Sequence, residues 1–147
     1  LAEYVELDEL LARADIVTLH APGLPENRHM IGAAELAGMK TGAILVNAAR
    51  GMLVDTAALV NAIESGHLGG AALDTIEHES NLYYRDASRE VLPNRDRAVL
   101  MALPNVIVSP HMAFYTAEDV EHMVRSTTEA LLAFSRGEDT PYEVHKG

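Results

Sequence analysis

Cysteine is absent from the 147-residue sequence. Its absence excludes disulfide bonds, thiolate metal ligands and a cysteine nucleophile, and it is typical of a cytoplasmic protein. Long apolar runs are absent too. None reaches the ~18 residues that a membrane-spanning helix needs, so we expect no membrane partner. Residues 1–11 contain neither a basic nor an apolar segment, and we therefore expect no secretory signal there.

Basic residues are few. The sequence has 11 Lys and Arg against 22 Asp and Glu, which gives a formal net charge of −11. Such a chain repels phosphate groups, so we expect neither nucleic acid nor an anionic membrane as a partner. The simpler meaning of the acidic excess is solubility. With 48% hydrophobic residues the chain is able to bury a core, and its length suits one domain.

Strand-like and helix-like patterns alternate along the chain. Strands are predicted at 15–20, 43–47, 70–73 and 106–108, and helices at 9–14, 33–39, 55–66 and 116–137. Continuous apolar strands separated by helices indicate a parallel sheet with helices on both faces. We therefore predict an α/β fold with a doubly wound parallel sheet over residues 1–115, followed by a long helix and tail over 116–147.

Two stretches depart from this alternation, and we predict both as loops. Residues 22–27 are rich in Gly and Pro, and residues 80–104 are long, carry mixed charge and include Tyr83 and Tyr84. A long ordered loop after a strand often has a function.

The functional residues of such sheets lie just past the carboxyl ends of the strands. Here that rule selects four segments, which are residues 20–22, 47–50, 74–79 and 109–111. Arg50 offers a planar guanidinium fork that grips a carboxylate with two hydrogen bonds, which suits an anionic substrate. The alternative for Arg50 is a structural ion pair with one of the 22 acidic residues.

His111 is the candidate general acid and base, because histidine exchanges protons near neutral pH. Asp74 and Glu79 follow the third strand, and a carboxylate near a histidine holds its ring in one tautomer. The alternative for these acids is a solvated loop, and we interpret Glu77 in that way. Apart from His20 and His111, which follow strands, we assign the histidines no role. No pair has the i, i+4 helical spacing of a zinc protease, so we expect no metal site.

A phosphate-binding glycine loop is not found. Residues 66–70 do not match the G-x-G-x-x-G pattern, and they precede a strand where that motif follows one. If a bound cofactor requires such a loop, residues outside this sequence must supply it.

Three segments together resemble one family. Residues 14–22 (ADIVTLHAP), 39–74 (MKTGAILVNAARGMLVDTAALVNAIESGHLGGAALD) and 103–116 (LPNVIVSPHMAFYT) are similar to the C-terminal cofactor-domain signatures of the D-isomer-specific 2-hydroxyacid dehydrogenases. The resemblance extends over roughly residues 7–136. It implies that residues 1–115 are the C-terminal portion of a Rossmann-like NAD-binding domain, and that the helix after residue 116 returns toward a substrate domain.

The resemblance also implies roles for individual residues. It makes Arg50, Glu79 and His111 catalytic, with Arg50 holding the substrate carboxylate and Asp74 orienting the nicotinamide amide. It also places Arg50 against NAD, and the remaining positions in this set are His20, Ala21, Pro22, Asn27, Ala48 and Ala49. Ala49 departs from the lactate branch, which often has Thr before the Arg. Full-length members of the family commonly form homodimers, and we expect the same here.

The branch of the family determines the expected substrate. Residues 112–116 (MAFYT) and the long 80–104 insert resemble D-lactate dehydrogenases and the related keto-acid reductases of glycopeptide-resistance operons. The reaction implied is NADH-dependent reduction of pyruvate to D-lactate. Phe114 and Tyr115 are candidates for the substrate-side wall, or for ordinary packing at the start of the helix.

Three alternatives stay open. Another 2-hydroxy acid, such as glycerate or phosphoglycerate, could be the substrate. A non-catalytic fragment or interaction module would have the same residues without the activity. A response-regulator-like signalling domain fits poorly, because it needs an acidic cluster at the first strand, where the sequence has only Asp15.

Overall fold

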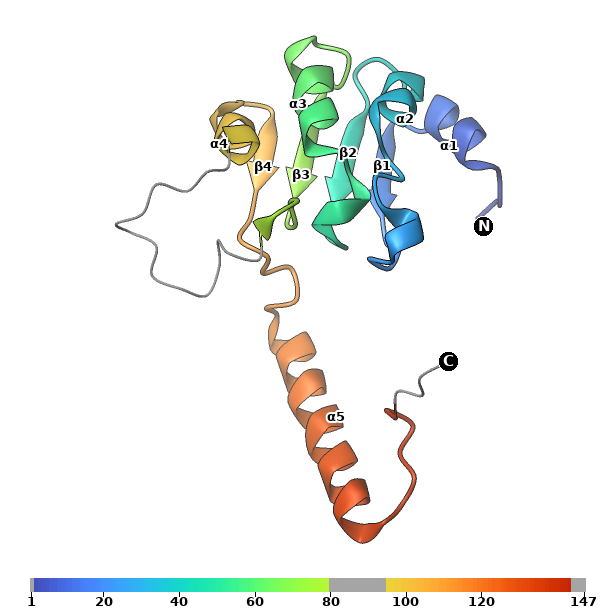
Figure 1. The fold of residues 1–147 in the computed structure, drawn as a ribbon, viewed down its shortest axis with the longest axis vertical. Helices are drawn as coiled ribbons and strands as arrows, with labels where there is room; N and C mark the ends of the chain where they lie inside the picture. The colour runs from blue at the N-terminus through green and yellow to red at the C-terminus, as the bar shows by residue number, and fades with distance from the viewer. Residues whose placement is uncertain (1, 80–94, 144–147) are drawn as a thin grey trace. The chain divides into compact units, whose positions relative to one another are not determined.

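A computed structural model describes residues 2–79 and 95–143 of the chain. It divides into two compact units, Leu1–His111 and Met112–Gly147. Their assignment to parts of two larger domains stays a prediction. Figure 1 shows the elements of both units.

The first unit is built on a four-stranded parallel sheet in the order β1-β2-β3-β4. The strands are β1 (Ile16–Leu19), β2 (Ile44–Asn47), β3 (Gly70–Leu73) and β4 (Val106–Val108). Ile44 pairs with Ile16 on one side and with Gly70 on the other, and Ala72 pairs with Ile107. All four predicted strands are confirmed within two residues, and their carboxyl ends lie at one edge of the sheet.

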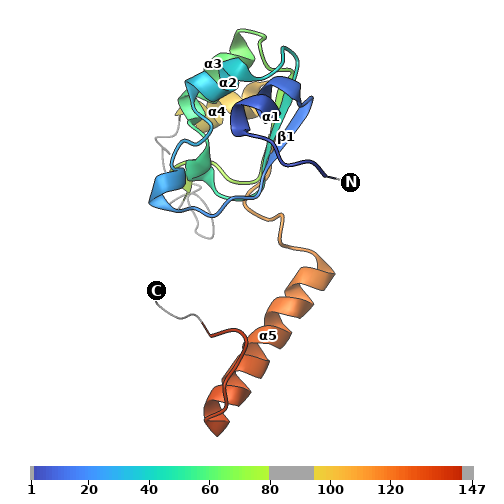
Figure 2. The ribbon, with the colours of Figure 1, turned by 90° about the vertical axis from the view of Figure 1, so that its right-hand side faces the viewer.

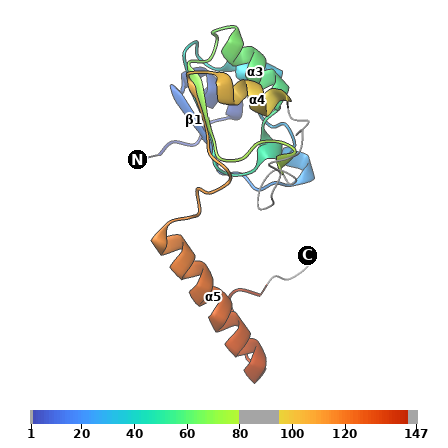
Figure 3. The same cartoon turned by 90° about the vertical axis from the view of Figure 1, so that its left-hand side faces the viewer.

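Four helices pack side by side on one face of this sheet, as Figures 2 and 3 show. They are α1 (Leu7–Arg13), α2 (Ala33–Gly38), α3 (Thr56–Glu64) and α4 (Arg95–Ala102). Helix α2 contacts α1 and α3, and α3 contacts α4. Each right-handed crossover leads to the next strand in line, which puts α2, α3 and α4 on the same face, and α1 packs beside α2. The buried core lies between this helix layer and the sheet, with Leu11, Leu36, Leu45 and Leu59 among its members.

The parallel α/β fold is confirmed, but helices cover one face only in the part of the chain described. On the other face Ile16, Ile44 and Ile107 are 61%, 39% and 70% exposed. The expected second layer needs a reversal in strand order, and β1 to β4 progress in a single direction.

Two predicted helices have the ends that the sequence indicates. The Asp55 carboxylate accepts a hydrogen bond from the Ala58 amide at 3.0 Å and caps α3. In the second unit, the Thr116 hydroxyl accepts from the Asp119 amide at 3.1 Å and caps α5 (Ala117–Arg136). Gly137 ends α5 in the left-handed region, with φ 67°. None of the described helices is both long and apolar enough to cross a membrane.

Helix α4 corrects the prediction of a loop over residues 80–104. It covers residues 95–102 and is anchored by Leu100, which is fully buried. In its sequence, RDRAVLMA, the apolar residues are consecutive and form no helical stripe, so the burial of Leu100 in the first unit is what identifies it. Tyr83 and Tyr84 lie outside the described residues.

Candidate active site

The segment after β2 is folded back by the side chain of Asn47, which is 1% exposed. Its Nδ2 donates to the Arg50 carbonyl at 3.0 Å, and its Oδ1 accepts from the Ala49 amide at 3.1 Å. These two bonds fix the backbone that carries Arg50. The guanidinium of Arg50 is exposed, and its Nη1 donates to the Ala49 carbonyl at 2.7 Å. Among the described residues it has no carboxylate partner, so the structural ion pair considered above is not found.

Gly51 joins this segment to the one after β3. A Cβ atom at Gly51 would lie 2.3 Å from the carbonyl carbon and oxygen of Ile76 and 2.7 Å from the Glu77 nitrogen. Only glycine allows the two backbones to approach so closely. Gly23 has a similar relation to Arg50, because its Cβ would lie 2.9 Å from Cγ of that side chain.

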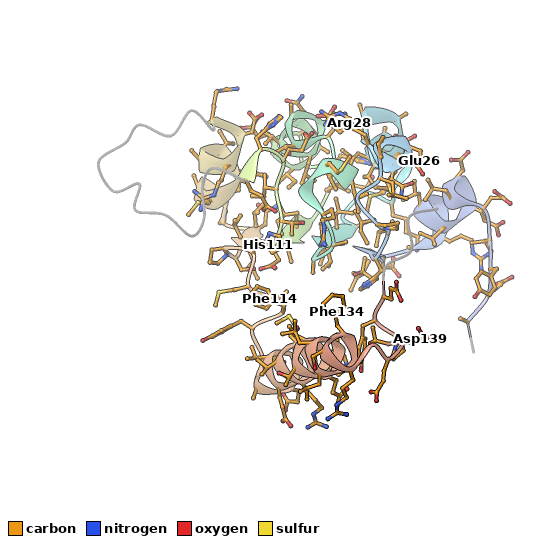
Figure 4. The ribbon with its side chains drawn as sticks, turned by 60° about the horizontal axis from the view of Figure 1, so that its bottom comes forward. Glu26, Arg28, His111, Phe114, Phe134 and Asp139 are labelled. Carbon is orange, nitrogen blue, oxygen red and sulfur yellow. The ribbon has the colours of Figure 1, made fainter. Side chains whose placement is uncertain are left out.

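The exits of β3 and β4 are also tied together. Asp74 is 6% exposed, and its Oδ1 accepts a hydrogen bond from the Ser109 hydroxyl at 2.6 Å. Its backbone carbonyl accepts from the His111 amide at 2.9 Å. His111 itself has φ 52°, in the left-handed region. The backbone of the predicted general acid is thus held directly against the end of the neighbouring strand (Figure 4).

The ring of His111 pairs with Glu79. Its Nδ1 lies 2.8 Å from Oε1 of the carboxylate, and the other oxygen of Glu79 accepts from the Ile76 amide at 2.9 Å. The two side chains are 33% and 16% exposed. A half-buried carboxylate with both oxygens engaged fixes the orientation and the tautomer of the imidazole.

A cavity of about 380 Å³ is lined by two of the three predicted catalytic residues, Arg50 and Glu79. It is lined by residues of three segments, among them Arg28, Arg50, His78 and Glu79. A larger hollow of about 680 Å³ lies between α2 and α3 on the helix layer, and half of its lining residues are alanine. That hollow contains none of the predicted site residues, so we place the site at the smaller cavity.

The positions expected to contact a cofactor lie at the same edge of the sheet. The exposed His20 ring contacts the Thr18 hydroxyl at 3.0 Å, and Asn27 donates to the Pro22 carbonyl at 2.9 Å. The remaining members of this set are small or compact, and they are Ala21, Pro22, Ala48 and Ala49. Short side chains at Ala48 and Ala49 leave the backbone accessible to a flat ring such as nicotinamide, and the family resemblance places Ala21 and Pro22 on the adenine side. The individual contacts stay predictions.

Glu77 corrects the sequence interpretation. We expected a solvated loop acid, whereas its side chain is 9% exposed and pairs with both Arg28 and His29. His29, for which no role was predicted, therefore has a structural contact next to the site. Burial of an acid depends on what surrounds it in the fold, and the sequence around Glu77 does not show this.

Phe114 and Tyr115 belong to the second unit. Their rings meet edge to face, with centroids 6.1 Å apart and an interplanar angle of 84°. They are 40% and 70% exposed. Their contact with a substrate stays a prediction.

The fold and the site together define a class of protein. A parallel α/β sheet places Arg50 and the Glu79–His111 pair at its carboxyl edge. This is the arrangement of a dinucleotide-dependent oxidoreductase domain. A family model described as "D-isomer specific 2-hydroxyacid dehydrogenase, NAD binding domain" matches residues 1–113, and the chain belongs to this family.

Individual relatives agree with the family. The chain is 51% identical over 128 residues to a D-specific alpha-keto acid dehydrogenase of Enterococcus faecalis, covering 87% of this chain and 38% of the relative. It is 44% identical over 132 residues to an aromatic 2-oxoacid reductase of Clostridium sporogenes, covering 90% and 40%. The structure of D-lactate dehydrogenase with NAD+ from Lactobacillus jensenii superimposes with a TM-score of 0.89 at 40% identity, covering 97% and 43%. The chain thus spans about two fifths of the length of these relatives.

Proposed function

We propose that the protein containing this chain reduces a small 2-keto acid to the D-2-hydroxy acid with NADH. The observation that carries this proposal is the Glu79–His111 pair, held at 2.8 Å at the edge of the sheet that also presents Arg50. Family membership supports NAD as the cofactor and 2-keto acids as the substrate class. The reaction needs one cationic anchor and one proton donor, and these residues supply both.

Arg50 is the anchor for the substrate. Its guanidinium is exposed, and the Asn47 side chain fixes the backbone that carries it, so the fork is available for a carboxylate. A 2-keto acid has its carbonyl oxygen next to this carboxylate. The same cation therefore stabilises negative charge as it builds on that oxygen.

His111 is the proton donor in the reducing direction and the acceptor in reverse. Because Nδ1 faces Glu79, Nε2 is the atom that exchanges the proton with the substrate. NADH, when bound, supplies the hydride. The residues at the β2 and β3 exits would hold its nicotinamide half, and Ala21 and Pro22 after β1 would line its adenine side.

Pyruvate, giving D-lactate, is the substrate that we favour. The support is the 112–116 run and the similarity to a D-lactate dehydrogenase structure. The similarity to an aromatic 2-oxoacid reductase shows that relatives with bulkier substrates have comparable sequences. Larger 2-keto acids, including aromatic ones, are therefore the second candidates.

A non-catalytic role is the alternative from a different class. The matched relatives are more than twice as long as the aligned region, and most of their residues have no counterpart in this chain. We also propose, from the family alone, a cytoplasmic protein that forms homodimers.

A cofactor-oxidation assay tests the proposal. The protein is expressed from its complete gene, and loss of NADH absorbance is followed with pyruvate, phenylpyruvate and hydroxypyruvate. We expect turnover with pyruvate and a D product by chiral analysis. NADH binding without turnover of any of these acids would contradict the enzymatic role, and turnover of phenylpyruvate alone would transfer the assignment to aromatic acids.

A further inference from the structure

Glu77 is a nearly buried carboxylate that the proposed reaction does not use. Its Oε1 lies 2.8 Å from Nε2 of His29 and 3.0 Å from Nη2 of Arg28. Its Oε2 accepts from the amide of Thr56 at 3.3 Å. The side chain is only 9% exposed, and burying an unpaired carboxylate is unfavourable. These three donors therefore stabilise Glu77 in its buried position.

The partners of Glu77 come from two distant parts of the chain. Arg28 and His29 lie in the segment between β1 and α2, and Thr56 is the first residue of α3. Glu77 thus fastens the segment after β3 to both of these. Close to the same point, Gly51 packs against the backbone of Ile76 and Glu77. The segment is therefore fixed immediately before it reaches Glu79.

One residue, His78, separates the two glutamates. It has φ 60°, in the left-handed region. Glu77, before it, pairs with His29, and Glu79, after it, pairs with His111. Each of these pairs has a nitrogen–oxygen distance of 2.8 Å. A short segment with a fixed turn transmits any displacement of Glu77 directly to Glu79.

We propose that Glu77 is a positioning residue, which fixes the carboxylate of Glu79 against Nδ1 of His111 by anchoring the segment that carries it. Glu77 needs no contact with substrate for this role. The inference rests on the proposed function for its kinetic consequence, but its structural consequence is independent of any activity.

The kinetic test compares Glu77→Gln with Glu64→Gln in the protein expressed from its complete gene. Both substitutions remove one negative charge, and Glu64 is exposed near the end of α3. We expect Glu77→Gln to lower kcat about 10-fold, because small displacements of catalytic groups are expensive, with little change in KM for NADH. The Glu64→Gln variant should match the wild type.

A double substitution separates positioning from direct action. In a Glu79→Gln background the carboxylate that Glu77 positions is already lost. The further substitution Glu77→Gln should then lower kcat by less than about two-fold, because the effects of two substitutions are not additive when one residue acts through the other. An equal loss in both backgrounds, or an unchanged kcat in the single variant, would overturn the inference.

Hydrogen exchange gives a readout that needs no turnover. The Ile76 amide is protected by its bond to Glu79, and the Asp74 amide by its bond to the Asn47 carbonyl. We expect Glu77→Gln to accelerate exchange at Ile76 about 10-fold and to leave Asp74 unchanged, because only the local contact opens. Unchanged exchange at Ile76, or equal acceleration at both amides, contradicts positioning. If the wild type reduces no 2-keto acid, the proposed function fails and this measurement still decides the role of Glu77.

Discussion

The Nδ1 atom of His111 lies 2.8 Å from Oε1 of Glu79, although the two residues are 32 positions apart in the sequence. This contact is produced by the fold. His111 is held by its amide to the end of β3, and Glu79 is held by the Ile76 amide.

Replacing His111 should remove the proton donor. We choose His111→Asn because the backbone is left-handed at this position, and asparagine tolerates that region well. The expected loss in kcat is about 10²–10⁴-fold, with protein stability and NADH affinity close to the wild type. Steady-state kinetics and a fluorescence titration with NADH measure the two effects. Near-normal turnover in this variant would remove His111 from the mechanism.

Replacing Arg50 by lysine keeps the charge and removes the planar fork. We expect KM for the keto acid to rise by about 10–100-fold, because hydrogen bonds to charged groups contribute about 1.5–3 kcal/mol. NADH affinity should change little. The two constants are measured separately by varying one substrate at saturating concentrations of the other. An equal loss for keto acid and NADH would show that Arg50 has a structural role.

The sequence identifies the strands and the residues at their ends, because the pattern of apolar runs and the family motifs are local. Arg50, Glu79 and His111 are therefore predicted as site residues without coordinates. The support beneath them is not local. Nothing in the sequence around Asn47 shows that its side chain will bond to the Arg50 backbone.

Glu77 and α4 show the same limit in another form. Glu77 is buried because Arg28 and His29 fold against it from a segment 48 positions away, a contact that no local pattern contains. Helix α4 depends on the burial of Leu100 and has no amphipathic stripe. Both were missed because burial of one side chain is decided by residues remote in sequence.

Gly51 should be intolerant of any side chain. In Gly51→Ala the new Cβ would lie 2.3 Å from the Ile76 backbone, so the two segments must separate. We expect a loss of about 1–3 kcal/mol in the free energy of unfolding, as for other overpacked sites, together with a fall in kcat. Gly38→Ala is the matched control, because a Cβ there meets nothing within 4 Å. Thermal denaturation should show a lower Tm for the first variant only.

The backbone conformation of His78 gives the last prediction. With φ 60° the residue occupies the left-handed region, which costs a non-glycine residue roughly 1–2 kcal/mol and a β-branched residue more. His78→Gly should therefore keep the wild-type Tm and most of the turnover, since glycine adopts this conformation freely. His78→Val should lower both, because the strained turn directs Glu77 and Glu79 to different histidines. If valine is tolerated as well as glycine, the left-handed turn does not hold the two glutamates apart, and the orientation of Glu79 must come from its own bond to the Ile76 amide.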